Sequence, residues 1–526
     1  MAQATSDDRL WVLIETGSNQ DFIFQSNRQH FHVGASEILH RVGAWVDDAV
    51  ERLEKGSGDV DKVVVTSSKA MLLVRDPEDG RAIVERVTRR ALVEAPGLDL
   101  WGYVESPTPD QADPMARIAD VHAAHAAVRW ERPSAKLRFL TYPFSDLCTR
   151  TGLPAAERRQ WPSSDSGDKE SLSPVAIAVR KASEGQTRQF LAKLAEDQAA
   201  LADRREEVVN AGWVAVVHID GNGVGDVIRG IDDLEVYRGF STLLQKATRE
   251  AFASACAIPE TEGRTEWLLP LIVGGDDVTF VCDARVAIPV VRAYLTAFEQ
   301  KTIGLPGLGE GEWLTAAAGI AVVKPHYPFH AAYHLAEQLA HNAKQAKKPD
   351  WVEAVGRRSA YDFHVLHDSV ASPLSELRRG FDVAKTAVSG AGQPRRLWPP
   401  LFLAPAGPPQ APTSHPCEDE HLLAGTAEIL RPRDEAPLSG SALHDLRDAL
   451  LRGEGADGRT LTRLRTNSRN PALLEEFLTT HLWLDEGRGG SFSRVLPIID
   501  LADITRGVAA GERPRKNAEH TQGASR

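Results

Sequence analysis

The chain has 526 residues, of which 42% are hydrophobic and 25% charged, a balance typical of a soluble protein with several packed domains. Its formal net charge of −12 argues against a globally basic nucleic-acid binder, although a local groove or a metal-bound nucleotide remains compatible with it. The longest apolar run, residues 313–323, is too short to span a bilayer, and the acidic start lacks the features of a signal peptide. With four scattered cysteines in addition, we expect a cytoplasmic protein without a membrane partner.

The first hundred residues predict a unit in which strands and helices alternate. Strands are expected at 10–14, 62–66, 71–74 and 98–104, and helices at 35–53 and 81–93. This β-helix-β-β-helix-β order is typical of a ferredoxin-like fold, here a palm domain over residues 1–110.

The same order of elements recurs in the second half of the chain. A buried strand at 213–219 is followed by the turn DGNGVG and a helix, and a hairpin at 271–283 comes next. A helix at 284–301, a strand at 313–323 and a helix at 329–347 complete the unit. We therefore predict an α+β protein with two ferredoxin-like palm domains, the product of an ancient duplication, together with helical domains.

The remaining segments are assigned by composition. Residues 111–210 are predicted to be a linker or helical domain with an exposed polar loop at 163–173 and a helix at 187–210. The later predictions are a catalytic palm at 211–350, a helical extension at 351–398, a Pro-rich linker at 399–440, a helical domain at 441–505 and a disordered tail at 506–526.

The hairpin LIVGGDDVTFVCD places Asp276 and Asp277 side by side at its predicted tip. Like charges repel there, so the two aspartates are either solvated turn residues or are neutralised by a cation. Asp220 ends the preceding buried strand, which lies beside such a hairpin in a ferredoxin-like sheet. Three convergent carboxylates suit Mg²⁺ or Mn²⁺, and two ions roughly 4 Å apart would activate a hydroxyl and stabilise leaving pyrophosphate. Gly274 and Gly275 would let a nucleotide approach the backbone closely.

Other interpretations of these residues stay open at this point. GNGVG, with Gly221, Gly223 and Gly225, partly resembles a dinucleotide fingerprint, but its spacing is wrong and an aspartate precedes it. A metal-bridged phosphate fits the segment better. Asp220 by itself would also serve as a helix N-cap. His218, on the strand face opposite to Ile219, is interpreted as a satisfied core histidine rather than a base.

Four motifs carry a resemblance to a known family: HIDGNGVG, LIVGGDDVTF, TAAAGIAVVKPHYP and AYHLAEQLAHNAK, in this order. Together they resemble the catalytic palm in the large subunit of type III CRISPR effector complexes, a family related to the GGDEF nucleotide cyclases. Residues 20–39 and 359–369 are similar to further stretches of that family, so that the resemblance covers roughly residues 10–110 and 211–370. It implies an enzyme that joins ATP into cyclic oligoadenylate messengers with Mg²⁺ or Mn²⁺.

The resemblance assigns roles to individual residues of this chain. Asp220, Asp276 and Asp277 become the catalytic metal ligands, and the backbone carbonyl of Gly221 is a further candidate ligand. Lys344 falls where related cyclases have a lysine, whose ammonium contacts the triphosphate. The nucleotide-binding residues implied in this way are Gly221, Asn222, Gly223, Gly225, Gly274, Gly275 and Lys344.

The chain also departs from the family pattern. Asn222 stands where a second aspartate is common, so one anionic ligand is lost. The first palm reads TSSKAML at 66–72 instead of a glycine-rich hairpin, so we expect a non-catalytic palm that holds the acceptor nucleotide. No nuclease is expected, since the chain begins directly at the palm. No zinc is expected either, because Cys148-x-x-Thr151-Gly152 resembles half of a zinc knuckle whose second cysteine is lost.

Three functions follow from these observations. The leading hypothesis is a metal-dependent nucleotidyltransferase that converts ATP or another nucleoside triphosphate into a cyclic oligonucleotide messenger in antiviral defence. One rival is a catalytically silent, nucleotide-binding scaffold of a CRISPR-like ribonucleoprotein, and the other is a stand-alone cyclic-dinucleotide synthase. RNA and other effector subunits are candidate partners.

Overall fold

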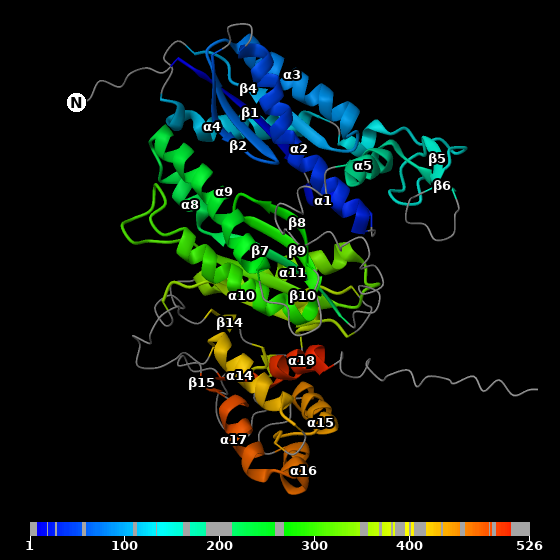
Figure 1. Cartoon of the computed structure of the whole chain (residues 1–526), viewed down its shortest axis with the longest axis vertical. Coiled ribbons are helices and arrows are strands. Elements are labelled where there is room, and N and C mark those ends of the chain that lie inside the picture. Colours follow the sequence, from blue (N-terminus) through cyan, green and yellow to red (C-terminus); the bar gives the residue numbers. More distant parts are fainter. Residues whose placement is uncertain are drawn as a thin grey trace, which may run out of the picture.

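The fold is taken from a computed structural model that describes most of the chain. The described residues are 8–17, 19–26, 29–54, 59–108, 113–132, 134–160, 169–185, 213–257, 268–347, 356–367, 371–379, 382–383, 395–398, 401–403, 417–432, 435–452, 458–482, 484–485 and 491–506. Among them, no helix combines the length and the apolar composition needed to cross a membrane. Figure 1 shows the first palm, the second palm and a C-terminal group of helices following one another along the long axis.

The first palm is a four-stranded antiparallel sheet in the order β2-β3-β1-β4. Its elements are β1 (Leu10–Gly17), α2 (Gln29–Glu54), β2 (Val60–Val65), β3 (Lys69–Val74), α3 (Pro77–Glu94) and β4 (Asp99–Val104). A short helix, α1 (Asn19–Ile23), lies between β1 and α2. Val12 and Ile14 lie in one core with the inner faces of α2 and α3, and Trp11 and Leu13 lie in another; both cores also contain residues of the second palm. Burial on both faces explains the continuous apolar run of β1.

The second palm repeats this sheet with the strand order β8-β9-β7-β10. Its elements are β7 (Val214–Asn222), α8 (Val224–Arg229), α9 (Leu234–Cys256), β8 (Leu268–Gly274), β9 (Asp277–Asp283), α10 (Ala284–Lys301), β10 (Thr315–Val323) and α11 (Phe329–Ala343). Two further strands, β11 (Ala360–Val365) and β14 (Leu401–Phe402), extend the sheet beyond β10. The shared strand order and helix placement confirm the predicted pair of ferredoxin-like palms.

The two faces of the second sheet differ in what covers them. Val217 and Ile219 point into the core formed with α9 and α10, and the alternate residues Val214 and Val216 lie in the core that contains α11. On the α11 side, Gly319 of β10 permits very close approach, since an added Cβ would lie 1.9 Å from a backbone oxygen of α11. The side of the sheet that carries α11 also carries Asp220, two positions along β7 from His218.

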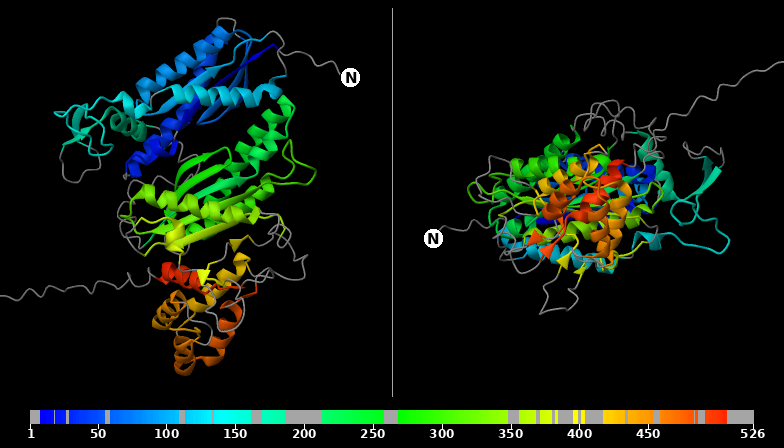
Figure 2. Two further views of the ribbon diagram at one scale, coloured as in Figure 1. Left: turned by 180° about the vertical axis from the view of Figure 1, so that it is seen from behind. Right: turned by 90° about the horizontal axis from the view of Figure 1, so that it is seen from below.

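The palms pack directly on one another, as the views in Figures 1 and 2 agree. Arg238 of α9 donates two hydrogen bonds of 2.7 and 2.8 Å to the carboxylate of Asp61 on β2. From the first palm, the buried hydroxyl of Ser36 on α2 donates to the carbonyl of Leu271 on β8. These hydrogen bonds, one set donated from the second palm and one from the first, hold the two palms together.

The segments outside the palms are less helical than predicted. Residues 111–185 form α4 (Pro114–Glu131), the 3-10 turn η1 (Ala135–Arg138), the hairpin β5 (Glu157–Gln160) and β6 (Lys169–Leu172), and α5 (Pro174–Gly185). The expected polar loop at 163–173 is wrong for 169–172, because β6 pairs with β5 and its last residue Leu172 is buried. The predicted helix at 187–210 lies outside the described residues.

Two further expectations need correction downstream. The described residues of the region 351–398 form the short strands β11, β12 (Asp382–Val383) and β13 (Arg395–Arg396) and the short helix α13 (Leu374–Leu377). Within the expected Pro-rich linker, β14 pairs with β11, and α14 (Asp419–Leu430) is a regular helix. Tyr361 and Phe363 of β11 and Leu401 of β14 are buried within the second sheet, which composition alone does not reveal.

The predicted C-terminal helices are confirmed. They are α15 (Gly440–Leu451), α16 (Arg459–Asn467), α17 (Pro471–His481) and α18 (Val495–Arg506), accompanied by the short strands β15 (Leu484–Asp485) and β16 (Ser491–Phe492). The predicted tail at 506–526 lies outside the described residues except for its first residue, which ends α18.

Candidate functional site

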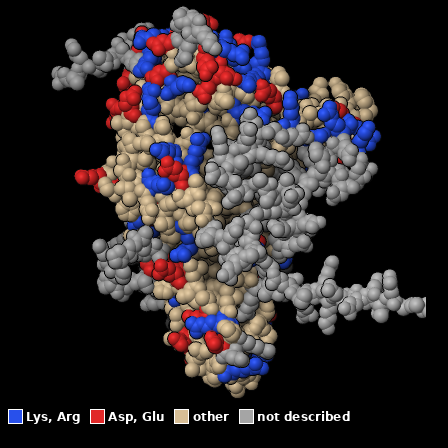
Figure 3. All heavy atoms as spheres, viewed as in Figure 1, with Lys and Arg blue, Asp and Glu red and all other residues tan. Residues whose placement is uncertain are grey.

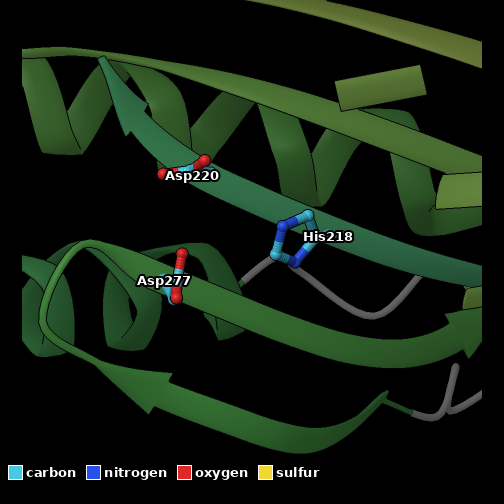
Figure 4. Close-up of side chains that lie close together, drawn as sticks. All are labelled: His218, Asp220 and Asp277. Atoms are coloured by element: carbon cyan, nitrogen blue, oxygen red, sulfur yellow. The ribbon is translucent and has the colours of Figure 1, made fainter. Parts of the chain in front are cut away.

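The candidate site lies where β7 and β9 pair next to the hairpin tip. Asp220 and Asp277 are directly paired across the two antiparallel strands. One oxygen of each, together with a ring nitrogen of His218, falls within a group of ligand atoms that are all within 4.8 Å of one another. Figure 4 shows the three side chains gathered above the β7–β9 pair. The strand β7 runs through Asn222, so Asp220 lies within the strand and not in the predicted turn, because β10 continues to pair with it.

The hairpin that carries Asp276 and Asp277 is built from a two-residue turn. Gly275 has a φ of 64°, a left-handed conformation that favours glycine, and its carbonyl accepts a 2.7 Å hydrogen bond from the hydroxyl of Thr248 on α9. The helix thereby holds the tip in place. The expected strand-turn-strand structure of the GGDD segment is confirmed.

Gly221 is required for the close approach of Asp276. The N–H of Gly221 donates to the backbone carbonyl of Asp276 over 3.2 Å. A Cβ added to Gly221 would lie 2.7 Å from the Cβ of Asp276 and 3.1 Å from its Oδ2. Because Gly221 has no side chain, the hairpin tip can fold over β7 at this position. The sequence alone did not indicate this steric requirement.

Lys344 reaches the site from the end of α11. Its ammonium forms an ion pair and a hydrogen bond with Oδ2 of Asp220, 124 residues earlier in the chain. The prediction placed this ammonium on a nucleotide triphosphate, whereas in the structure it neutralises part of the carboxylate cluster. About a quarter of each side chain is exposed, so the ion pair is open to solvent.

The two tip carboxyls hold their protons more tightly than ordinary aspartates. Burial, with the Asp220 carboxylate adding to it, raises the pKa of Asp276 to about 6. Burial together with the carboxylates of Asp276 and Asp220 raises the pKa of Asp277 to about 8, although the side chain of Asp277 still reaches solvent. Without a further cation the cluster does not ionise fully near neutral pH. A set of oxygen donors with unfavourable self-repulsion fits a divalent cation that prefers oxygen ligands.

His218 belongs to the same group of side chains, a placement that sequence analysis did not predict. It was interpreted as a satisfied core histidine rather than a base, and in the structure it lies on the same strand face as Asp220, with a ring nitrogen within 4.8 Å of a carboxylate oxygen of Asp220 and of Asp277. Its Nδ1 lies 3.1 Å from the hydroxyl oxygen of Thr279 on β9. The available signal was the i, i+2 spacing on one strand, which places alternate side chains on one face.

The other predicted nucleotide-binding residues surround the site without converging on one point. Asn222 is buried, and its amide donates over 3.1 Å to the hydroxyl of Thr315 on β10. Gly223 caps α8 with a φ of 76°, and Gly225 lies in the first turn of that short helix. Gly274 ends β8, where an added Cβ would lie 3.5 Å from the hydroxyl oxygen of Ser67 in the first palm. The binding roles of these residues remain predictions.

The closeness of Gly274 to Ser67 shows that the hairpin tips of the two palms meet. The strand registers identify the equivalent positions in the two palms. In the first palm, Glu15 of β1 pairs with Lys69 of β3 as the last pair before the hairpin. Asp220 and Asp277 occupy the corresponding positions in the second palm. Lysine in place of Asp277 reverses the charge, which agrees with the expectation that the first palm is non-catalytic. Glu15, however, is an acid at this position that sequence analysis missed.

Comparison with known proteins shows what this chain is similar to. Residues 213–352 match the family model described as Cas10/Cmr2, second palm domain. Among solved structures, a Csm1–Csm4 cassette in complex with cA3 is similar at a TM-score of 0.51 and 12% identity, covering 95% of this chain and 70% of that one. The corresponding apo cassette, at 12% identity, covers 97% of this chain and 71% of that chain with a TM-score of 0.47. Csm1 of T. onnurineus gives a TM-score of 0.41 at 12% identity over 94% and 70% of the two chains.

These likenesses differ in weight. At 12% identity, the first structural similarity establishes a shared fold and no more, and the other two lie below a TM-score of 0.5. The curated proteins provide no match. The fold and the family match thus define a palm-domain protein with duplicated ferredoxin-like units. More particularly, residues 213–352 form a palm domain similar to the Cas10/Cmr2 second palm, the part of the chain in which the sequence motifs lie.

Proposed function

We propose that this protein is a metal-dependent nucleotidyltransferase that joins ATP, or another nucleoside triphosphate, into cyclic oligonucleotide messengers. The observation that carries the proposal is the direct pairing of Asp220 with Asp277, at the hairpin tip of a domain that matches the Cas10/Cmr2 second palm. A cassette of similar fold was crystallised in complex with cA3, which supports nucleotide chemistry of this class.

The residues of the chain divide the work as follows. Asp220 and Asp277, with Asp276 beside them, would hold one or two divalent ions, Mg²⁺ or Mn²⁺. Such ions supply charge stabilisation for the triphosphate and lower the pKa of an attacking hydroxyl. Lys344, now paired with Asp220, would turn its ammonium towards the phosphates as a point charge.

The first palm would hold the acceptor nucleotide next to this site. Its hairpin tip at Ser67 meets Gly274 of the second palm, so a nucleotide bound on either palm would face the other. Lys69 occupies the position in the first palm that Asp277 has in the second, so its ammonium would supply the positive charge that a metal ion supplies in the second palm. This arrangement assigns donor and acceptor to different palms.

Other subunits of a type III effector and RNA are the proposed partners. Basic and acidic side chains are interspersed over the first palm on the face drawn in Figure 3, so a partner that binds this face would meet charges of both signs. The rival, a silent nucleotide-binding scaffold, draws support from Asn222, whose amide is bonded to Thr315 inside the protein and supplies no negative charge.

The test is incubation of the full chain with Mn²⁺ and labelled ATP, with and without RNA, followed by mass spectrometry of the products. We expect cyclic oligoadenylates from the wild type and none from Asp276→Ala with Asp277→Ala. The matched control is Asp47→Ala with Asp48→Ala, another adjacent aspartate pair, which lies on α2 and forms surface ion pairs. Nucleotide binding without product would favour the scaffold, and a cyclic dinucleotide would favour the stand-alone synthase.

A further inference from the structure

The candidate metal site of the second palm has a ring nitrogen beside its carboxylates. His218 and Asp220 are two residues apart on β7 and project from the same face of the strand. Asp277 enters from the neighbouring strand β9, opposite Asp220. Ligand atoms of the three residues lie within 4.8 Å of one another, and Figure 4 shows the imidazole beside the two carboxylates.

The imidazole is held in place by its neighbours. Nδ1 lies 3.1 Å from the hydroxyl oxygen of Thr279, the residue paired with His218 across β7 and β9. The ring of Tyr333 on α11 packs edge-on against it, with ring centroids 5.5 Å apart and planes at 69°. When Nδ1–H donates to Thr279, Nε2 keeps its lone pair. A metal-binding histidine is commonly oriented by such a hydrogen bond from its other ring nitrogen.

The donor set of this site differs from a set of carboxylates alone in two ways. Asn222 is neutral, with its amide nitrogen donating to Thr315, so it brings no negative charge. The imidazole of His218 offers a donor that the carboxylates do not. Mg²⁺ demands oxygen ligands in near-ideal octahedral geometry, whereas an imidazole donor suits transition-metal ions such as Zn²⁺, Fe²⁺ and Ni²⁺.

We propose that His218 is a ligand of the divalent ion in this site and makes the site favour a transition-metal ion over Mg²⁺, with Mn²⁺ as the probe that tests it. The inference rests on the proposed function insofar as the ion is the one used by the nucleotidyltransferase. It adds the identity of a ligand and the class of the metal.

The experiment measures Mn²⁺ binding to the full chain by electron paramagnetic resonance. Electron-nuclear spectra of the Mn²⁺-loaded wild type, prepared with ¹⁴N- or ¹⁵N-labelled histidine, report a coordinated imidazole directly. His218→Gln assigns the signal, and His218→Phe keeps the aromatic contact with Tyr333 while it removes the donor. His341→Gln is the matched control, since His341 is exposed on the same helix as Tyr333.

We expect a histidine nitrogen coupling in the wild type and in His341→Gln, and none in either variant of His218. The ratio of Mn²⁺ to Mg²⁺ affinity should fall by about tenfold in His218→Gln. Loss even of an outer-shell partner of a metal ligand commonly lowers the metal affinity 10–100-fold. Mn²⁺ that binds without histidine coupling would overturn the inference and leave the proposed function intact. Absence of both Mn²⁺ binding and product formation would overturn both.

Discussion

Replacing both tip aspartates by asparagine, Asp276→Asn with Asp277→Asn, should stabilise the metal-free hairpin in a pH-dependent way. In the folded protein the pKa of Asp276 rises from 3.8 to about 6, so the folded state binds this proton more tightly than the unfolded state. The contribution of this carboxyl to stability is therefore fully present below pH 4 and is lost as the pH rises through the folded pKa. Asp277, whose pKa rises to about 8, extends the loss in the same direction.

The magnitude follows from Asp276 alone, since Asp277 is too exposed to be converted into an energy. At about 1.4 kcal/mol for each pKa unit, the shift of Asp276 corresponds to about 3 kcal/mol. Water at the hairpin tip reduces it, so we expect about 1–3 kcal/mol. Because asparagine does not titrate, the advantage of the variant should be small at pH 4, rise through the pKa of Asp276 near 6 and rise further through the pKa of Asp277 near 8.

Amide hydrogen exchange in β9, measured in the presence of EDTA and corrected for the intrinsic rate, tests this expectation. Local opening is the appropriate quantity because a chain with several domains does not unfold in one step. Mn²⁺ should raise the opening free energy of the wild type and leave the variant unchanged. Asp47→Asn with Asp48→Asn should show neither effect in β9. A variant equal to the wild type at all pH values would refute the repulsion argument and, with it, the cation site.

Three further substitutions test how the site is assembled. Gly221→Ala should displace Asp276 and cost about 1–3 kcal/mol of stability through overpacking, together with weaker Mn²⁺ binding by calorimetry. Lys344→Met should leave Asp220 without its ion-pair partner, raise the KM for ATP and change kcat less, as steady-state kinetics would show. Gly319→Ala should force α11 away from β10, so the melting temperature should fall and Lys344 should lose its contact with Asp220; an unchanged melting temperature would contradict the close packing.

The order of elements in both palms follows from local sequence pattern. Apolar runs such as residues 10–14 and 213–219 bury on both faces of a sheet, and the pair Gly274–Gly275 permits a tight turn before Asp276. The pattern failed where partner strands decided the outcome. The short strands at 169–172 and 401–402 carry little signal of their own and exist because β5 and β11 pair with them.

By itself the sequence determined the two palms, the hairpin with its paired aspartates and the motifs that identify the family, because these depend on short-range periodicity and turn chemistry. Only the tertiary structure decided which side chains share the site. Register between strands places Asp277 opposite Asp220, and the packing of α11 on β10 brings in Lys344. Whether His218 is a core residue or a ligand depends on what lies above its strand face, and a strand's own residues do not specify that.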